Sequence, residues 1–360
     1  MCYNISEAEL VVSTEDNVFK DVLIAYPFTK PEDVKTAFRL ASQHLRDPQL
    51  PELTITVMVD CMTHLYKLSI AWHKEAEKMI HSLKTSQKKL KESYNSLKLR
   101  VCIDYDMSLC YLYNYVHLGV HRSPIYNTKK FSELVAALDD FPNLILTSVM
   151  GYEAQISGVP LNNPFTKWMN PIMKIFQRIS KRDVLRKRRE MKEVIRKYGY
   201  NLEFVNGGGT GSFLWTLQDP NVSEVSVGSG FLQSHIFDWF HDNESKCALT
   251  FTIECTRKPK KGTITCQSGG FIASGNICKD KAPSVFLPPK LKPYDAEGFG
   301  EVQTPLSGSD ANRIDIGDYI FLRPAKAGEI AERFNEYVCI RNNTIQFTAP
   351  TYRGLGYCFF

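Results

Sequence analysis

The segment VNGGGTGS at residues 205–212 has the composition of an anion-binding loop. It follows an apolar, β-branched run and precedes a helical stretch. Three adjacent glycines let backbone N–H groups approach an anion closely, and the N-terminus of the following helix adds a favourable dipole. The spacing matches neither the dinucleotide fingerprint nor the P-loop, because no Gly-Lys-Ser/Thr triplet follows. The segment therefore predicts a phosphate site, with a tight strand-to-helix turn as the alternative.

A second glycine turn, VGSG at residues 227–230, follows the next apolar run. In a barrel of parallel strands, the carboxyl ends of successive strands are neighbours on the face where ligands bind. The second turn therefore strengthens the prediction of an anion site shared between the two turns.

Other residue types point away from several classes of protein. The ten cysteines form no Cys-x-x-Cys pair, and there is no histidine pair at metal spacing. This pattern argues against zinc and against a disulfide framework, and it favours a reducing compartment.

The basic stretch Lys174–Lys197 lacks interleaved aromatic residues and has an apolar stripe, so we expect a solvated outer helix. The net charge of +5 is too small to predict nucleic-acid binding. No window of eighteen apolar residues predicts a membrane span, and the opening MCYNISEAEL does not resemble a secretory signal.

The elements that position these turns alternate along the chain. Six short apolar runs are predicted to be strands buried on both faces: 22–26, 54–59, 101–104, 144–149, 202–205 and 222–227. Helical stretches separate them, and the clearest has an apolar stripe from Trp72 to Leu97. This alternation indicates a parallel sheet, in a barrel or a doubly wound fold. After Asp242 the runs become β-branched and broken by Gly and Pro, so we expect two domains, residues 1–242 and a mainly antiparallel β domain at residues 243–360.

Longer motifs carry a resemblance to a known family. HLGVHRSP (117–124), MGYEAQISGV (150–159), EFVNGGGTGS (203–212) and EVSVGSG (224–230) occur in this order. They are followed by GGFIASG (269–275), GEVQTPLSG (300–308), AKAGEIAERFNE (325–336) and PTYRGLGYCFF (350–360). Over nearly its whole length the chain resembles the alanine-racemase-like (fold type III) pyridoxal-phosphate enzymes. Within that class it is most similar to the D-threonine aldolase and D-serine dehydratase branch, in particular to amino acid deaminase/aldolase proteins.

The resemblance implies a (β/α)8 barrel that holds pyridoxal 5'-phosphate at the carboxyl ends of its strands, followed by a β domain. By position, the phosphate is expected on residues of the two glycine turns: Gly208, Gly209, Thr210, Gly211, Gly228 and Ser229. Arg122 is expected to face the pyridine nitrogen, and Tyr152 to lie near the cofactor at a strand end. The alternatives are a surface arginine in a basic loop and a half-buried core tyrosine.

Two departures from the family pattern affect the chemistry. Members of the class carry the Schiff-base lysine on a strand that precedes a segment like Met1–Asn4. This chain is therefore expected to lack that lysine and the first strand–helix unit, which leaves no catalytic residue to assign. We expect seven barrel strands, open between the Cys2-Tyr3 segment and the strand ending at Val227. The resemblance implies a metal-binding histidine in the run 317–329, but this chain has none there, so no metal is predicted. Lys326 would place a cation at that position instead, and the alternative is a solvated surface lysine.

The predicted function is that of a pyridoxal-phosphate-dependent amino acid lyase. It would act on a D- or β-hydroxy amino acid, by retro-aldol cleavage or by β-elimination and deamination. The expected partner is a small-molecule amino acid substrate, with no nucleic acid and no membrane; the expected compartment is cytoplasmic, and a homodimer is compatible with the resemblance. The alternative is a non-catalytic cofactor- or partner-binding relative, or a fragment without a function of its own.

Overall fold

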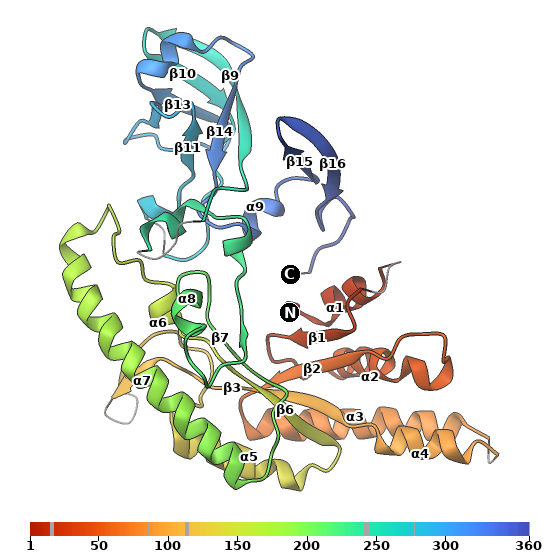
Figure 1. Ribbon diagram of the computed structural model, residues 1–360. Helices are drawn as coiled ribbons and strands as arrows, with labels where there is room; N and C mark the ends of the chain where they lie inside the picture. The colour runs from red at the N-terminus through yellow and green to blue at the C-terminus, as the bar shows by residue number, and fades with distance from the viewer. Residues whose placement is uncertain (15–17, 85, 112–114, 241–244, 277, 360) are drawn as a thin grey trace. The chain divides into compact units, whose positions relative to one another are not determined.

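The computed structural model in Figure 1 describes residues 1–14, 18–84, 86–111, 115–240, 245–276 and 278–359. The chain forms two compact units. The first contains Met1–Gly158, Phe176–Ser226 and Phe359, and the second contains Val159–Ile175 and Val227–Cys358. The domain boundary predicted at Asp242 lies outside the described residues, so the division into 1–242 and 243–360 stays a prediction.

A six-stranded parallel sheet forms the centre of the first unit. Its strands are β1 (Asp21–Ile24), β2 (Thr54–Val59), β3 (Leu99–Asp104), β6 (Leu144–Gly151), β7 (Phe204–Gly207) and β8 (Glu224–Val225), in the order β1-β2-β3-β6-β7-β8. Each strand pairs in parallel with its neighbour. The six predicted strands and their parallel arrangement are confirmed, and the sheet is an incomplete barrel.

The segment expected to be a seventh strand makes only a single bridge. Cys2 pairs in parallel with Ile24, next to β1. Asn4 already caps helix α1 (Ile5–Val12) by accepting a hydrogen bond from the Glu7 N–H, so little extended backbone is left for pairing. Among the described residues, β8 has no strand neighbour beyond β7, so the sheet is open as predicted.

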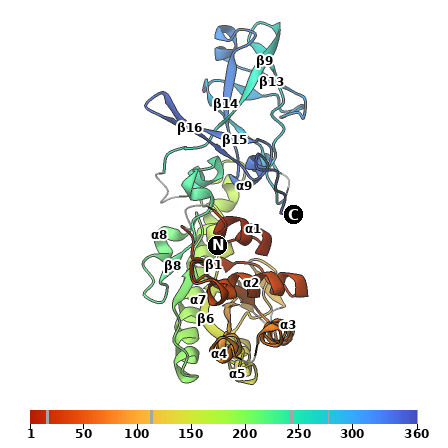
Figure 2. The same ribbon diagram turned by 90° about the vertical axis from the view of Figure 1, so that its right-hand side faces the viewer.

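Helices cover one face of this sheet. They are α2 (Pro31–Arg46), α3 (Met62–Ser82), α4 (Lys88–Ser96), α5 (Thr128–Ala137), α6 (Ala154–Ser157), α7 (Asn170–Lys197) and α8 (Phe213–Thr216). Figure 2 shows α2, α3, α4 and α5 grouped on one side of the unit. Strand residues such as Val57, Val101 and Val149 point into the core beneath the helices, whereas the alternate residues Met58 and Cys102 form a small apolar cluster of their own. None of the helices in the described part of the chain is long and apolar enough to cross a membrane.

The helical stretch predicted from Trp72 to Leu97 is divided into α3 and α4. Ser82 ends α3, and the Lys84 N–H donates a hydrogen bond to the side chain of Gln87 instead of to a helical carbonyl. Ser82 lies at this break, and serine is a weak helix former because its side chain competes for backbone hydrogen bonds. The apolar stripe continues across the break, since Met79, Leu90 and Leu97 all pack against the same core.

The second unit is built on an antiparallel sheet, as the sequence predicts. Its strands are β9 (Phe251–Lys260), β10 (Thr263–Gln267), β11 (Ser284–Leu287), β12 (Lys292–Pro293), β13 (Gln303–Ser307) and β14 (Tyr319–Arg323), in the order β11-β14-β9-β10-β13-β12. Its separate core includes Ile253, Cys266, Leu306 and Ile320. Helix α9 (Gly328–Ala331) and a hairpin of β15 (Glu336–Arg341) and β16 (Thr344–Pro350) follow. The first unit has one such hairpin as well, β4 (Leu109–Tyr111) with β5 (Val116–Leu118).

Candidate functional site

Polar side chains gather where the parallel strands end. Residues two positions apart on a strand share a face, so Asp60 follows Met58 and Asp104 follows Cys102 on the face away from the helix-covered core. Tyr152 follows Met150 in the same way, directly after β6. In barrels and in open parallel sheets ligands bind at the carboxyl ends of the strands. This edge is therefore the candidate site.

The structure brings together two residues predicted to contact a cofactor, Arg122 and Tyr152. The Arg122 Cζ atom lies 5.6 Å from the centroid of the Tyr152 ring, within the range of a cation–π contact. Arg122 is exposed and Tyr152 is half-buried. Burial raises the pKa of the Tyr152 phenol above its usual value, although Ser157 and Arg122 oppose this change. The phenol is therefore protonated at neutral pH and can donate a hydrogen bond.

The glycine-rich loop connects β7 to α8 and packs against Tyr152. Gly208 has φ +81°, a conformation that side chains with a Cβ rarely adopt. A Cβ on Gly209 would lie 2.2 Å from Ser157 Oγ and 2.8 Å from Tyr152 Cε2. Glycine is therefore required at position 209, because any side chain would push the loop away from Tyr152.

The backbone N–H groups of this loop do not all point at a common anion. The Gly208 N–H donates to the Glu153 carboxylate at 3.1 Å, and the Gly209 N–H donates to Ser212 Oγ at 3.2 Å. Helix α8 has a single turn, so its dipole adds less than the sequence suggests. Within residues 115–240 the Gly211 N–H has no hydrogen bond, which leaves it available to a phosphate oxygen. Thr210 is buried in the same turn.

A buried ion network holds the loop, and sequence reasoning missed it. Glu153 is fully buried and accepts hydrogen bonds from Arg188 Nη2 at 2.7 Å, Ser212 Oγ at 2.9 Å and Thr216 Oγ1 at 2.5 Å, besides the Gly208 N–H. Arg188 also donates to the Gly151 carbonyl at 3.2 Å and pairs with buried Asp219 at 3.3 Å. Helix α7 is thus not only a solvated outer helix.

The available signal for this network was the helical register of α7. Its buried residues recur every three or four positions, and Val184 and Met191 belong to this stripe. Lys187 and Arg188 lie between them and are buried too. A basic residue on the apolar stripe of a helix indicates an internal charge partner, because an unpaired buried charge is too costly.

Asp104 carries an unusual carboxyl group at the same edge. Burial raises its pKa to about 7, with Asp60 and Asp106 adding to the increase and Arg122 opposing it. Within the described part of the chain this carboxyl group makes no hydrogen bond or ion pair. The group therefore changes protonation state near neutral pH.

Gly228 and Ser229 belong to the second unit, where they begin a short 3-10 helix (Ser229–Phe231). A Cβ on Gly228 would meet no atom within 4 Å, so glycine is not sterically required there. Their contact with a phosphate stays a prediction.

Lys326, also in this unit, donates hydrogen bonds to the backbone carbonyl of Ser274 at 2.9 Å and to the Ser274 hydroxyl at 3.1 Å.

Comparisons with known proteins identify the fold. No protein-family model matches the sequence, and the comparison with curated proteins found no match. Among solved structures, D-threonine aldolase from Filomicrobium marinum matches with a TM-score of 0.72 at 17% identity, covering 100% of this chain and 81% of that one. D-threo-3-hydroxyaspartate dehydratase from Delftia sp. HT23 matches with a TM-score of 0.65 at 15% identity, over 96% of this chain and 82% of that one. An alanine racemase-like protein from Idiomarina loihiensis matches with a TM-score of 0.62 at 14% identity, over 97% of this chain and 82% of that one.

The chain has the alanine-racemase-like fold. The matches include both the parallel sheet of the first unit and the antiparallel sheet of the second, since they cover nearly the whole chain. The fold class predicted from the sequence is thereby confirmed: an alanine-racemase-like barrel, incomplete in this chain, followed by a β domain.

Proposed function

We propose that this protein binds pyridoxal 5'-phosphate at the carboxyl edge of its parallel sheet and acts as an amino acid lyase. The reaction would be retro-aldol cleavage or β-elimination with deamination of a D- or β-hydroxy amino acid, as in the D-threonine aldolase and D-serine dehydratase branch. The observation that carries the proposal is the contact of three predicted elements at one edge: Arg122, Tyr152 and the loop at Gly209. Two of the similar structures are an aldolase and a dehydratase of hydroxy amino acids by name.

The residues present fit a phosphorylated cofactor. Among the described residues the Gly211 N–H has no hydrogen-bond partner, and glycine at position 209 lets the loop lie directly against Tyr152. Gly208, Gly209, Thr210 and Gly211 would hold the phosphate, with Gly228 and Ser229 as further candidates. Glu153 carries a buried negative charge behind the loop, and this charge would repel a bound phosphate. The ion pair with Arg188 compensates the charge, so the loop can accept an anion.

Arg122 and Tyr152 have distinct proposed roles. Pyridoxal phosphate, when bound, supplies an electron sink for the α-carbon of an amino acid. Arg122 does not release its proton, so at the pyridine nitrogen it would donate a hydrogen bond without protonating the ring. Tyr152, protonated because burial raises its pKa, would hold a proton at its hydroxyl next to Arg122.

The substrate class, assembly and compartment belong to the same proposal. We infer a small amino acid as substrate and a homodimer as the assembly from the family resemblance. A cytoplasmic location is supported by the ten cysteines, all of which are free in the structure.

A binding experiment tests the cofactor site directly. Pyridoxal phosphate and inorganic phosphate are titrated into the full chain and into Gly209→Ala, with cofactor absorbance and a thermal shift as readouts. We expect saturable binding to the wild type and at least about tenfold weaker binding to Gly209→Ala, a loss of about 1.4 kcal/mol. Gly328→Ala is the matched control, since its Cβ would meet no atom within 4 Å. Equal affinities of wild type and Gly209→Ala would refute the phosphate cradle.

Product analysis separates the candidate reactions. D-threonine and other β-hydroxy amino acids are incubated with the cofactor-supplemented full chain. Retro-aldol cleavage gives glycine and an aldehyde, whereas elimination and deamination give a keto acid and ammonia. Specific cofactor binding without either product would favour the non-catalytic relative.

A further inference from the structure

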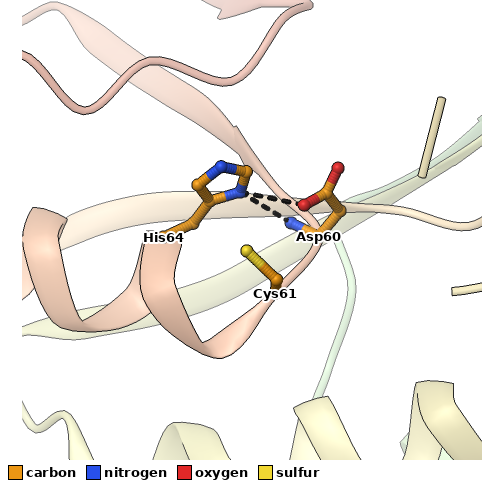
Figure 3. Close-up of side chains that lie close together, drawn as sticks. All are labelled: Asp60, Cys61 and His64. Carbon is orange, nitrogen blue, oxygen red and sulfur yellow. Dashed lines mark hydrogen bonds and ion pairs between the residues drawn. The ribbon is translucent and has the colours of Figure 1, made fainter. Parts of the chain in front are cut away.

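Asp60, Cys61 and His64 form a compact group at the carboxyl end of β2 (Figure 3). Cys61 is the N-cap residue of α3, and His64 in the first turn of that helix folds back toward Asp60. One ligand atom from each of the three side chains lies within 4.8 Å of the others. The Asp60 and His64 side chains are only 12% and 21% exposed.

The contact between Asp60 and His64 requires a proton or a metal ion between the two side chains. His64 Nδ1 lies 3.0 Å from Asp60 Oδ1, and it also lies 3.3 Å from the Asp60 backbone N–H. A carboxylate oxygen and an imidazole lone pair at this distance repel each other unless a proton or a metal ion lies between them.

A second carboxylate adds negative charge beside this group. Val59 and Ile103 are paired in register on β2 and β3, so Asp60 and Asp104 follow at equivalent positions on neighbouring strands and on the same face. Within the described residues, His64 is the only side chain in an ion pair with either carboxylate. The acidic groups Asp60, Asp104 and Cys61 outnumber the basic side chains that act on them, His64 and Arg122, which favours a divalent cation.

A second group of the same residue types already has a buried cation beside it. Asp106, Cys110 and His117 also lie within 4.8 Å of one another, and Cys110 faces His117 across the β4–β5 hairpin. There, buried Lys187 supplies an internal cation: its ammonium donates to the backbone carbonyls of Asp106 at 3.1 Å and Ser108 at 2.7 Å. This second group is therefore the natural control for the first.

We propose that Asp60, Cys61 and His64 bind one Zn²⁺ ion. A thiolate, an imidazole and a carboxylate are the ligands that zinc prefers, and three protein ligands leave a fourth position for water, as in catalytic zinc sites. On binding, the Cys61 thiol releases its proton to solvent and the Sγ–Zn bond forms, while Asp60 Oδ1 and a neutral His64 complete the set. Zn²⁺ compensates the thiolate and the Asp60 carboxylate, and Asp104 lies outside the ligand set. The site does not depend on the proposed cofactor.

Cobalt is the spectroscopic probe for this site. The full chain, freed of metal with EDTA and kept reduced, is titrated with Co²⁺, and the thiolate-to-cobalt charge-transfer band is recorded. We expect one Co²⁺ per chain, displaced by Zn²⁺. Cys61→Ser should lose the band, and His64→Gln should weaken binding at least about tenfold. Cys110→Ser should behave like the wild type.

The same titration can overturn the proposal. It fails if the wild type shows no charge-transfer band, if Cys61→Ser keeps the band, or if Cys110→Ser loses it. Far-UV circular dichroism checks that each variant is folded, and His64→Gln provides a second test if Cys61→Ser is not. Because no pyridoxal phosphate is present, failure of the cofactor proposal leaves this result unaffected.

Discussion

At the residue scale, the most connected side chain is Glu153. Its carboxylate accepts hydrogen bonds from one arginine, two hydroxyl groups and one backbone N–H, and it is completely buried. Hydrogen bonds to a charged group are stronger than neutral ones, and a buried charge without its partner is very costly. Glu153 therefore fixes the conformation of the glycine-rich loop as much as the glycines do.

Replacing Glu153 with Gln should destabilise the protein by about 3–5 kcal/mol, because Arg188 loses one of its two buried carboxylate partners. Urea unfolding measures the change. Glu203→Gln is the control: Glu203 also pairs with an arginine, Arg100, but it is half-exposed, so less than about 1 kcal/mol is expected. Similar losses for both variants would contradict the role assigned to the buried network.

Asp104 predicts a specific dependence of stability on pH. Its pKa rises from the ordinary 3.8 to about 7 on folding, so between these values the folded state holds a proton that the unfolded state has released. Stability therefore falls as the pH rises from about 4 to about 7. Asp104→Asn removes this contribution, and we expect the variant to gain stability relative to the wild type as the pH rises through this window. Urea midpoints at both ends, with EDTA present, check this; a pH-independent difference would show that burial does not shift this group.

At the element scale, Trp72 links three helical segments. Its indole N–H donates a hydrogen bond at 2.9 Å to the carbonyl of Leu97, the residue after α4. Its ring makes an edge contact with Phe38 of α2, with the ring centroids 4.9 Å apart. The break between α3 and α4 is tolerated because this side chain holds both sides of it against one core.

Trp72→Ala should cost about 3–5 kcal/mol, since it opens a cavity and leaves the Leu97 carbonyl without its donor. Tyr66→Ala on the exposed face of the same helix should change stability by no more than about 0.5 kcal/mol. Chemical denaturation of both variants tests the difference. A small effect of Trp72→Ala would mean that the two helices are held by other contacts.

At the scale of the whole molecule, the two units have separate cores. Leu146 is buried in the first core and Leu306 in the second. Compact units with their own cores open as separate cooperative regions, so the loss of a buried side chain should be felt mainly within its own unit.

Leu146→Ala and Leu306→Ala should each destabilise one unit by about 2–5 kcal/mol. Hydrogen exchange followed by mass spectrometry on the full chain should show faster exchange in β2, β3 and β6 for the first variant, and in β9, β10 and β13 for the second. Equal acceleration in both units from either substitution would show that the chain unfolds as one cooperative body.

The sequence by itself determined the local order of this protein. Continuous apolar runs predicted the six parallel strands, and glycine and proline punctuation predicted the antiparallel sheet, because both signals depend on nearby residues. Gly209 was also predictable, since three adjacent glycines indicate a close approach of backbone. The buried network of Glu153 was not, because Arg188 lies 35 positions from Glu153 and 31 positions from Asp219, and it meets both carboxylates only when α7 packs against the sheet. The group of Asp60 and His64 was missed for a related reason. Asp104 lies beside this group only because β2 pairs with β3. Tertiary structure decided which charges face one another, since electrostatic energy depends on distance in space and not along the chain.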